Sequence, residues 1–302
     1  MARSGLFSDI MTRREERYIL GKIIKKEKLA PAVTRMIVEA PHIASERRPG
    51  QFIILQVHDD GERIPLTIAD ADAQAGTITI IFQVVGRTTH LLDALEQGQE
   101  IAHLVGPLGQ PTHIEKFGHV VCVGGGIGAA PLYPIAQGMR QAGNRLTVIL
   151  GARNSDLLIL EDEMREIADQ LIVCTDDGST GRKALVTEPL DECCRQTPPP
   201  DLVVAIGPPI MMKFCSETTR PFGISTVVSL NTIMIDGTGM CGGCRVTVGN
   251  QTKFVCVDGP EFDGHQVDFD NMMRRLAAYR DDEQKDHHRC HLELQISEQE
   301  GA

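Results

Sequence analysis

The stretch HVVCVGGGIGAAP, residues 119–131, decides the fold of the middle of the chain. Its apolar start has the length of a β-strand, and a helical pattern follows it as far as Gln141. Glycines at such a junction let backbone N–H groups approach a phosphate at the helix N-terminus, where the helix dipole favours an anion. We therefore predict a strand–loop–helix unit with a nucleotide site. The alternative is a tight turn that binds no ligand. The residues expected at this site are Gly124, Gly125, Gly126, Gly128, Ala129 and Pro131.

Three more apolar runs follow, at 146–151, 171–175 and 202–206, and a helical pattern covers 160–170. Strands that alternate with helices indicate a parallel α/β sheet. Ligands of such sheets bind at the carboxyl ends of the strands, and these positions strengthen the nucleotide interpretation. The residues that follow the strands and are expected to contact the nucleotide are Gly151, Arg153, Asp176, Asp177, Gly178, Gly207 and Pro208.

The region before this sheet has a different pattern, in which short runs of Ile and Val are separated by Gly, Pro and Asp clusters. Several short strands at such spacing indicate a sandwich or a barrel. A short helix is expected over 88–96, with Thr88 or Thr89 as its cap. The expected strands cover 18–25, 33–39, 51–57, 77–85 and 100–105.

Two motifs of this β region have the chemistry of anion sites. The segment RIPLTI, residues 63–68, places Arg63 where its guanidinium can bind a diphosphate, and Thr67 offers a hydroxyl toward a planar ring. The segment GRTT, residues 86–89, opens a helix with N–H donors and hydroxyls. An ordinary edge strand is the alternative for the first motif taken alone. Together the two motifs predict a ligand whose diphosphate spans them.

A third motif, DGTGMCGGCRVTVGNQTKFVC, covers residues 236–256. Its glycines allow backbone N–H groups to approach sulfur atoms, as they do around iron–sulfur clusters. Plant-type ferredoxins use the spacing C-x4-C-x2-C with a distant fourth Cys, and this chain has that spacing with an Asp in the first place. An iron–sulfur site is therefore favoured. A zinc site and unligated thiols are the alternatives. The expected ligands are Asp236, Cys241, Cys244 and Cys256.

Composition limits the possible function classes. The chain has 302 residues, which predicts about two domains, and its 30 Lys and Arg against 41 Asp and Glu give a net charge of −11. That charge and the 4% aromatic content argue against nucleic-acid binding. The six other cysteines are scattered, and an odd total of nine argues against a disulfide framework. The long uncharged run at 120–139 contains too many Gly and Pro residues for a membrane span. No signal peptide is recognised, so we expect a cytoplasmic protein.

The three motifs, taken in this order, resemble those of the ferredoxin–NADP reductase superfamily. Within it, the chain is similar over about residues 18–280 to the electron-transfer subunit of dihydroorotate dehydrogenase B. The segments MIDGTGMCGGCRVTV and KFVCVDGPEFDGHQVDFD are more similar to a sister family. That family is the small subunit of NADH-dependent reduced ferredoxin:NADP oxidoreductase, also labelled sulfide dehydrogenase beta. The first cluster ligand is Cys in the former family and Asp in the latter, as at Asp236.

The resemblance implies a fold and a set of cofactors. A β-barrel FAD domain (18–113) would precede an α/β parallel-sheet nucleotide domain for NAD(H) (114–225), a small C-terminal 2Fe-2S lobe (226–268), and a helix with an acidic tail (269–302). The lobe would hold a 2Fe–2S cluster on the Asp and the three Cys named above. FAD would contact Arg63, Pro65, Leu66, Thr67, Ile68, Gly86, Arg87, Thr88 and Thr89.

The resemblance also implies a flavin and iron–sulfur oxidoreductase subunit. Flavin would lie between hydride transfer from nicotinamide and one-electron transfer through the cluster, so no side chain needs to act as a catalytic acid or base. A larger flavin and iron–sulfur subunit would complete a heterodimer. NADP stays open as a substrate because Arg153 follows the second strand. A stand-alone reductase and a nucleotide- and metal-sensing regulator are the rival functions.

Overall fold

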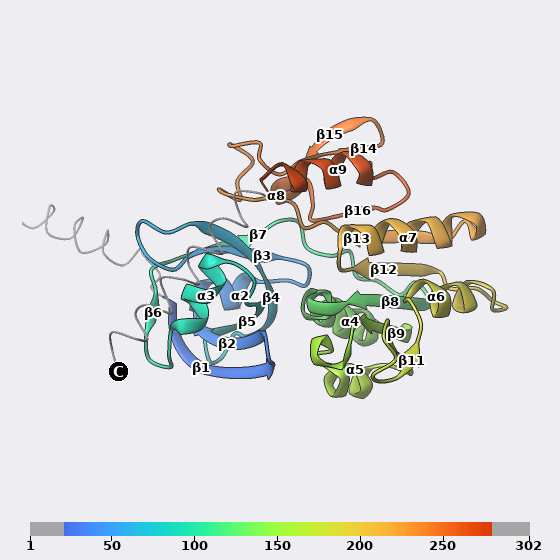
Figure 1. Cartoon of the computed structure of the whole chain (residues 1–302), viewed down its shortest axis with the longest axis horizontal. Coiled ribbons are helices and arrows are strands. Elements are labelled where there is room, and N and C mark those ends of the chain that lie inside the picture. Colours follow the sequence, from blue (N-terminus) through green and yellow to red (C-terminus); the bar gives the residue numbers. More distant parts are fainter. Residues whose placement is uncertain (1–20, 280–302) are drawn as a thin grey trace, which may run out of the picture.

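The computed structural model describes residues 21–279 (Figure 1). The start of the first expected strand at residue 18 and the predicted acidic tail lie outside the described residues. Two seven-stranded sheets and a two-stranded hairpin make up the described chain. The predicted fold class, a β-barrel followed by a parallel α/β sheet and a small C-terminal lobe, is confirmed.

The first sheet is antiparallel and curls into a nearly closed barrel. Its strand order is β6-β1-β2-β5-β4-β3-β7, and only Ala102 separates the two edge strands in the sequence. The sheet therefore joins its own edges through one residue. The strands are β1 (Gly21–Ala30), β2 (Val33–Glu39), β3 (Phe52–Gln56), β4 (Arg63–Asp72), β5 (Thr77–Gln83), β6 (Glu100–Ile101) and β7 (His103–Leu108), and the helices are α2 (Pro41–Glu46) and α3 (Arg87–Ala94).

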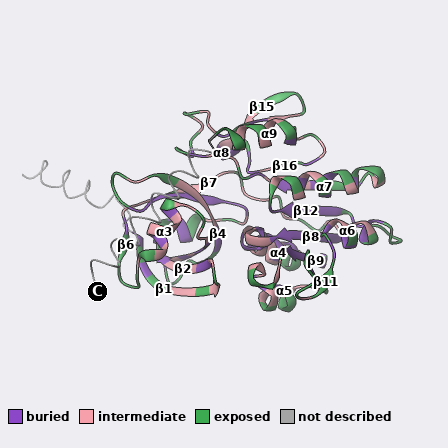
Figure 2. Ribbon diagram, in the orientation of Figure 1, coloured by how far each residue is buried: buried purple, intermediate pink, exposed green. Residues whose placement is uncertain are grey.

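The barrel interior is filled by the aliphatic side chains that the sequence places on its strands. Ile78, Ile80 and Phe82 of β5 point to the same side and are almost fully buried, because side chains alternate along a strand. Ile43 of α2 and Leu92 of α3 have no exposed surface and join the same core. Figure 2 shows buried segments of the barrel strands in purple.

The second sheet has the order β11-β10-β9-β8-β12-β13-β16, with every pair parallel except β13 and β16. One face is covered by α4 and α5, and the other by α6 and α7. The strands are β8 (His119–Gly125), β9 (Arg145–Ala152), β10 (Gln170–Thr175), β11 (Arg182–Lys183), β12 (Leu202–Ile206), β13 (Ser225–Ser229) and β16 (Glu261–Asp263). The helices are α4 (Ala129–Gln141), α5 (Glu161–Ile167), α6 (Thr187–Cys194) and α7 (Pro209–Thr219), with 3-10 turns η1 (Gly126–Gly128), η2 (Ser155–Leu157) and η3 (Arg220–Phe222).

The cysteine lobe is an excursion from this sheet between β13 and β16. It contains β14 (Arg245–Val248), β15 (Gln251–Phe254) and α8 (Val255–Asp258), and α9 (Phe269–Leu276) with the turn η4 (Ala277–Tyr279) packs beside it. Strand β16 and all of β13 except its first residue, Ser225, fall inside the range 226–268 predicted for the lobe, although both strands belong to the α/β sheet. The domain bounds themselves stay a prediction.

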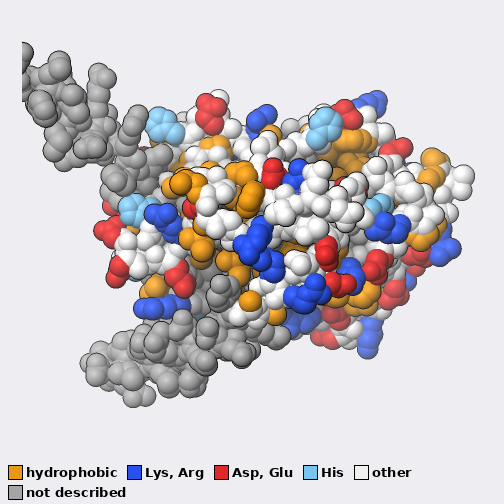
Figure 3. Space-filling view, turned by 90° about the horizontal axis from the view of Figure 1, so that it is seen from above, with side chains coloured by type: hydrophobic (Ala, Val, Ile, Leu, Met, Phe, Trp, Pro, Cys, Tyr) orange, Lys and Arg blue, Asp and Glu red, His pale blue; other side chains and the backbone are white. Residues whose placement is uncertain are grey.

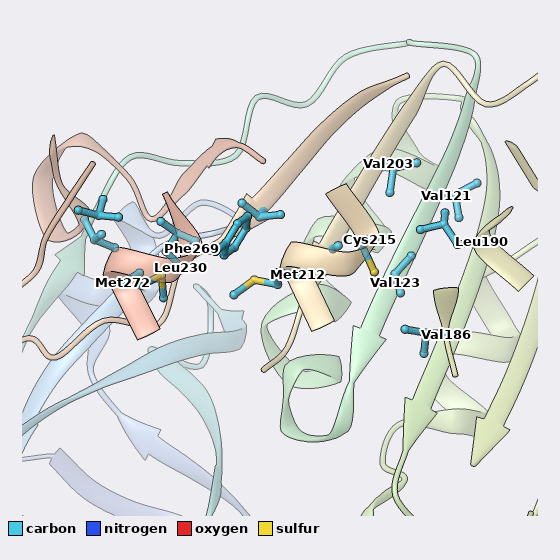
Figure 4. Close-up of a cluster of buried hydrophobic side chains, with 14 of the residues drawn as sticks. Val121, Val123, Val186, Leu190, Val203, Met212, Cys215, Leu230, Phe269 and Met272 are labelled. Carbon is cyan, nitrogen blue, oxygen red and sulfur yellow. The ribbon is translucent and has the colours of Figure 1, made fainter. Parts of the chain in front are cut away.

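One hydrophobic cluster connects the lobe with the α/β sheet. Figure 4 shows Met212 and Cys215 of α7 between the sheet strands and Phe269 and Met272 of α9. All four side chains are at least 95% buried. The lobe is therefore packed onto the sheet by a common core.

Three details of the predicted elements are wrong. The helix expected over 88–96 begins at Arg87 with Gly86 as its cap, because the Thr89 hydroxyl accepts the Gly86 N–H at 3.0 Å from inside the first turn. The strand expected over 100–105 is interrupted at Ala102, whose N–H turns to the Val57 carbonyl. The helix expected over 160–170 ends at Ile167, because β10 begins three residues later.

Candidate functional site

The barrel strand β4 presents the RIPLTI motif on a surface that the barrel leaves partly open. Pro65, Leu66 and Thr67 are half-buried, whereas Ile68 is fully buried. Strand β4 pairs with β5 only from Ile68 onward, so the absent N–H of Pro65 removes no hydrogen bond from that ladder. The open surface of β4 is therefore free for a planar ligand.

The two anion motifs of the barrel lie side by side. The Thr88 hydroxyl donates to the Glu62 carboxylate at 2.6 Å, which joins the start of α3 to the start of β4. Both threonine hydroxyls are thus hydrogen-bonded within the protein, and their contacts with a ligand stay a prediction. The guanidiniums of Arg63 and Arg87 are exposed, and a Cβ added at Gly86 would meet no atom within 4 Å. Cationic groups and open space at this junction fit a diphosphate.

The glycine-rich loop after β8 is shaped by the end of β12. A Cβ on Gly128 would lie 2.3 Å from the Ile206 carbonyl oxygen, so only Gly allows this approach. Gly126 has φ +54° and faces open space, and no side chain caps α4. Free N–H groups at a helix N-terminus fit a pyrophosphate. The loop is therefore suited to the predicted dinucleotide.

Sequence reasoning missed Met211, which covers this loop. Its sulfur would lie 2.3 Å from a Cβ on Gly125, and its methyl carbon 2.7 Å from a Cβ on Gly207. The side chain therefore fills the space between the two glycines at the sheet edge. Its position just after Gly-Pro-Pro was the available signal.

The other predicted dinucleotide residues lie at the same edge of the sheet. Because β8, β9, β10 and β12 are parallel neighbours, Gly125 lies opposite Gly151 and Ala152 opposite Thr175. The N–H of Asp177 donates to the Arg153 carbonyl at 3.2 Å, which ties the loops after β9 and β10 together. The structure thus brings the predicted strand-end residues to one edge. Their ligand roles stay predictions.

Asp177 is held at this edge as a carboxylate. Its Oδ1 accepts the N–H of Ser179 at 2.8 Å. The hydrogen bonds from the Ser179 side chain and backbone lower the pKa of this carboxyl below its ordinary value. The charge at this position is therefore negative at neutral pH.

The cysteine loop holds its four predicted ligands in two pairs. The Asp236 carboxylate accepts the backbone N–H of Thr238 at 2.9 Å and that of Cys241 at 2.7 Å, and the hydrogen bond from Thr238 most strongly lowers its pKa. The thiols of Cys244 and Cys256 lie 3.3 Å apart and are buried. Burial, and then the Cys244 thiol, raise the pKa of Cys256 to about 12.

The side chains of the cysteine loop are of the type that binds an iron–sulfur cluster, but they are not arranged around one common point. Within residues 21–279, no three His, Cys, Asp or Glu side chains converge in a way that could hold a metal ion. However, the Gly243 N–H points to the Cys241 sulfur at 3.4 Å, which is the kind of contact that stabilises a cluster sulfur. Gly237, Gly239 and Gly242 have positive φ, which lets the loop turn sharply around the thiols.

The barrel motif lies between the nucleotide edge and the cysteine loop. Helix α4, which follows the glycine-rich loop, packs against β4. On the other side, a Cβ on Gly237 would lie 2.8 Å from Ile54, and Ile54 is paired with Pro65 of β4. The Gln110 side chain also donates to the Val257 carbonyl at 2.9 Å. The three predicted sites are therefore consecutive in space.

Two family models match this chain. The oxidoreductase NAD-binding domain matches residues 122–217, which run from β8 into α7. The iron–sulfur cluster binding domain of dihydroorotate dehydrogenase B matches residues 231–268, which include all four predicted cluster ligands. No helix of the described chain has the length and apolar character needed to cross a membrane.

Curated relatives extend the similarity to nearly the whole chain. A Thermotoga maritima protein described as a dihydroorotate dehydrogenase B (NAD(+)) electron transfer subunit homolog is 51% identical over 264 residues, which cover 87% of this chain and 93% of the relative. The dihydroorotate dehydrogenase B electron transfer subunit of Streptococcus pneumoniae is 32% identical over 249 residues, which cover 80% of this chain and 97% of the relative.

Solved structures agree with this result. A chain from a structure of the NADH-dependent reduced ferredoxin-NADP oxidoreductase superposes with a TM-score of 0.84 at 49% identity, covering 89% of this chain and 97% of that chain. A ferredoxin NADP+ reductase of Neisseria gonorrhoeae, solved with FAD and NADP, shares the fold with a TM-score of 0.56 at 18% identity, covering 68% and 92%. The resemblance predicted from the motifs is confirmed: the chain belongs to the family of dihydroorotate dehydrogenase B electron transfer subunits and their homologues.

Proposed function

We propose that this chain is the electron-transfer subunit of a flavin and iron–sulfur oxidoreductase. It exchanges hydride with NAD(H) and single electrons with a larger partner subunit, as in NADH-dependent ferredoxin:NADP oxidoreductase. The observation that carries this proposal is the position of β4, with its Arg-x-Pro-Leu-Thr motif, between the glycine-rich loop and the cysteine loop. A two-electron donor and a one-electron carrier are thus separated by a site suited to flavin.

Each of the three sites has a defined task in this proposal. The guanidiniums of Arg63 and Arg87 hold the FAD diphosphate, and Pro65 to Thr67 line its ring. The N-terminal N–H groups of α4 hold the pyrophosphate of NAD(H). No side chain has to move a proton during hydride transfer, because nicotinamide and flavin supply the reacting atoms.

The cofactors supply the redox chemistry when they are bound. FAD takes up electrons in pairs and releases them singly, and a 2Fe–2S cluster carries one electron at a time. The cluster would be held by Asp236, Cys241, Cys244 and Cys256, with the Gly243 N–H near one sulfur. Zinc stays the alternative metal for the same donors, and the match to the iron–sulfur domain model favours the cluster.

The face around the cysteine loop is suited to a protein partner. Met240 is 88% exposed beside the cysteines, Ile235 is 52% exposed and Val105 on the neighbouring β7 is 49% exposed. Figure 3 views the molecule from this side and shows hydrophobic side chains gathered in patches between charged ones. Such exposed apolar side chains support docking of another subunit. We propose the larger flavin and iron–sulfur subunit as the occupant, and a cytoplasmic location for the complex.

Anaerobic purification of the full chain together with its partner tests the proposal. We expect one FAD, two iron and two sulfide per copy of this chain, a brown colour, and a larger flavin-containing subunit in the same complex. A stand-alone reductase would contain the cofactors and pass electrons to a diffusible acceptor without a partner. A colourless zinc protein would contradict the proposal and would favour a regulator.

The electron acceptor separates the two branches of the family. The first predicted cluster ligand of this chain is Asp236, and an Asp at this position favours the ferredoxin:NADP oxidoreductase branch. We therefore expect the purified complex to reduce NADP with NADH and reduced ferredoxin, and not to oxidise dihydroorotate. Dihydroorotate oxidation by the complex would place the chain in the other branch.

A further inference from the structure

One buried polar atom at the dinucleotide edge lacks a partner within the protein. The side-chain oxygen Oδ1 of Asn154 has no hydrogen bond among the described residues, and only two other buried side-chain atoms there share this state. A buried amide oxygen without a hydrogen bond is unfavourable by roughly 1–3 kcal/mol. The oxygen therefore marks a position where a donor from outside the chain completes the structure.

The backbone fixes this asparagine at the end of the second strand of the α/β unit. Asn154 follows β9 by two residues and is the N-cap residue of the turn η2, with extended φ −152°. The next N–H, of Ser155, donates to the Ser179 hydroxyl at 2.8 Å, and the preceding carbonyl, of Arg153, accepts the Asp177 N–H. Hydrogen bonds on both sides thus hold the residue against the neighbouring loop.

In dinucleotide-binding sheets, the end of the second strand lies at the adenosine ribose. A hydroxyl at the 2′ position donates a hydrogen bond, whereas a 2′-phosphate offers only acceptor oxygens at neutral pH. An amide oxygen can therefore accept a hydrogen bond from the 2′-hydroxyl, but the 2′-phosphate has no hydrogen to donate to it. We propose that Asn154 selects NAD(H) over NADP(H) by accepting the hydrogen bond of the adenosine 2′-hydroxyl, an inference that rests on the proposed NAD(H) site.

The charges around this loop agree with that selection. Asp156 and Asp177 lie on the two joined loops. A cavity of about 360 Å3 beside Ser155 is lined by the acidic residues Glu161, Asp162 and Glu163. These carboxylates oppose a phosphate with two charges. The exposed Arg153 is the one cation within 153–156 and is the residue that would favour the phosphate.

The test uses the full chain loaded with its cofactors and compares the binding of NADH and NADPH by titration calorimetry. We expect the wild-type protein to bind NADH more tightly. Asn154→Ala weakens NADH binding about 5- to 10-fold, which corresponds to one lost hydrogen bond, and leaves NADPH binding unchanged. Asn154→Asp retains the acceptor, so it restores NADH binding and weakens NADPH further.

The matched control is the adjacent cation. Arg153→Ala should weaken NADPH binding more than NADH binding, because Arg153 is predicted to contact the dinucleotide and its positive charge favours the 2′-phosphate. Equal losses for both dinucleotides in Asn154→Ala, with no rescue by Asn154→Asp, would show a structural role and overturn the inference. A wild-type preference for NADPH would also overturn it. Absence of binding for both dinucleotides in the wild type would instead show that the proposed NAD(H) site is wrong.

Discussion

The nucleotide edge of the α/β sheet and the cysteine loop differ in how completely the chain builds them. At the sheet edge, Gly128 is fixed by a close approach to the Ile206 carbonyl, and the loops after β9 and β10 are hydrogen-bonded to each other. In the cysteine loop, two thiols lie 3.3 Å apart, while the third cysteine is exposed. The first site is finished by backbone geometry, and the second has its ligands only partly assembled.

This difference indicates how strongly the binding of each ligand is coupled to the folding of its site. A preformed site binds its ligand with little reorganisation. A metal site whose ligands are not yet assembled couples metal binding to the folding of its loop. We therefore expect loss of the cluster to affect the lobe strongly and the nucleotide edge only weakly.

The largest expected effect comes from a cluster ligand. Cys244→Ser should lower the iron content of the purified protein to near zero, because a serine hydroxyl does not replace a thiolate ligand. NADH binding should stay within about 3-fold of the wild type, since the sheet edge is built independently of the metal. Iron analysis and calorimetry measure the two effects. The matched control is Cys194→Ser, which changes a buried thiol on α6 and should retain the iron.

A substitution at the sheet edge should give the reverse result. Gly128→Ala places a Cβ 2.3 Å from the Ile206 oxygen, so the loop has to shift. We expect NADH to bind at least about 10-fold more weakly and the protein to lose about 1–3 kcal/mol of stability, with the iron retained. Gly143→Ala is the control, because it introduces backbone strain at φ +84° in open space and should not change NADH binding. Unchanged NADH binding in Gly128→Ala would contradict the preformed site.

A smaller effect is expected when the oxygen ligand is exchanged. Asp236→Cys replaces a hard carboxylate by a soft thiolate, so the cluster should be retained with a different reduction potential. Iron analysis shows the retention, and a redox titration followed by spectroscopy measures the potential. A potential identical to that of the wild type would show that Asp236 is not a ligand.

The smallest effect concerns Glu261 of β16, which lies where the barrel, the linker after β7 and the sheet meet. Its carboxylate accepts the Thr112 hydroxyl at 2.5 Å, and burial raises its pKa from 4.5 to about 7. Between about pH 4.5 and 7, Glu261 is therefore protonated in the folded state and ionised in the unfolded state. The resulting stabilisation is complete below about pH 4.5 and disappears as the pH rises through 7.

Thermal unfolding of Glu261→Gln at several pH values tests this assignment. Relative to the wild type, the variant should gain stability as the pH rises from about 5 to 8, because the amide stays neutral. Glu166→Gln, at an exposed position on α5, is the matched control. A constant difference for Glu261→Gln would contradict the raised pKa.

The sequence predicts most of the fold because its periodicities are local. Runs such as 33–39 and 202–206 coincide with β2 and β12, since alternating or continuous apolar residues are read directly as strands. The return of β16 to the α/β sheet was not predictable, because three residues of mixed polarity carry no periodic signal. That pairing depends on the long-range packing of the lobe.

The candidate site shows the same limit. Glycine motifs and cysteine spacings name the binding segments, because they reflect local backbone requirements. The Thr88 hydroxyl donates a hydrogen bond to Glu62, which lies 26 residues away in the sequence. The Asn154 side-chain oxygen stands out because it has no hydrogen-bond partner among the described residues. Such features arise only from the three-dimensional arrangement, so the sequence does not reveal the hydrogen bond of Thr88 or the unpaired oxygen of Asn154.

The central claim is that electrons from NADH reach an iron–sulfur cluster on the cysteine loop by way of flavin. Anaerobic addition of NADH to the purified full chain, followed by electron paramagnetic resonance at low temperature, tests it most directly. We expect the signal of a reduced 2Fe–2S cluster in the wild-type protein and its absence in Cys244→Ser. A wild-type protein whose flavin is bleached by NADH without any cluster signal, or which contains zinc in place of iron, would contradict the claim.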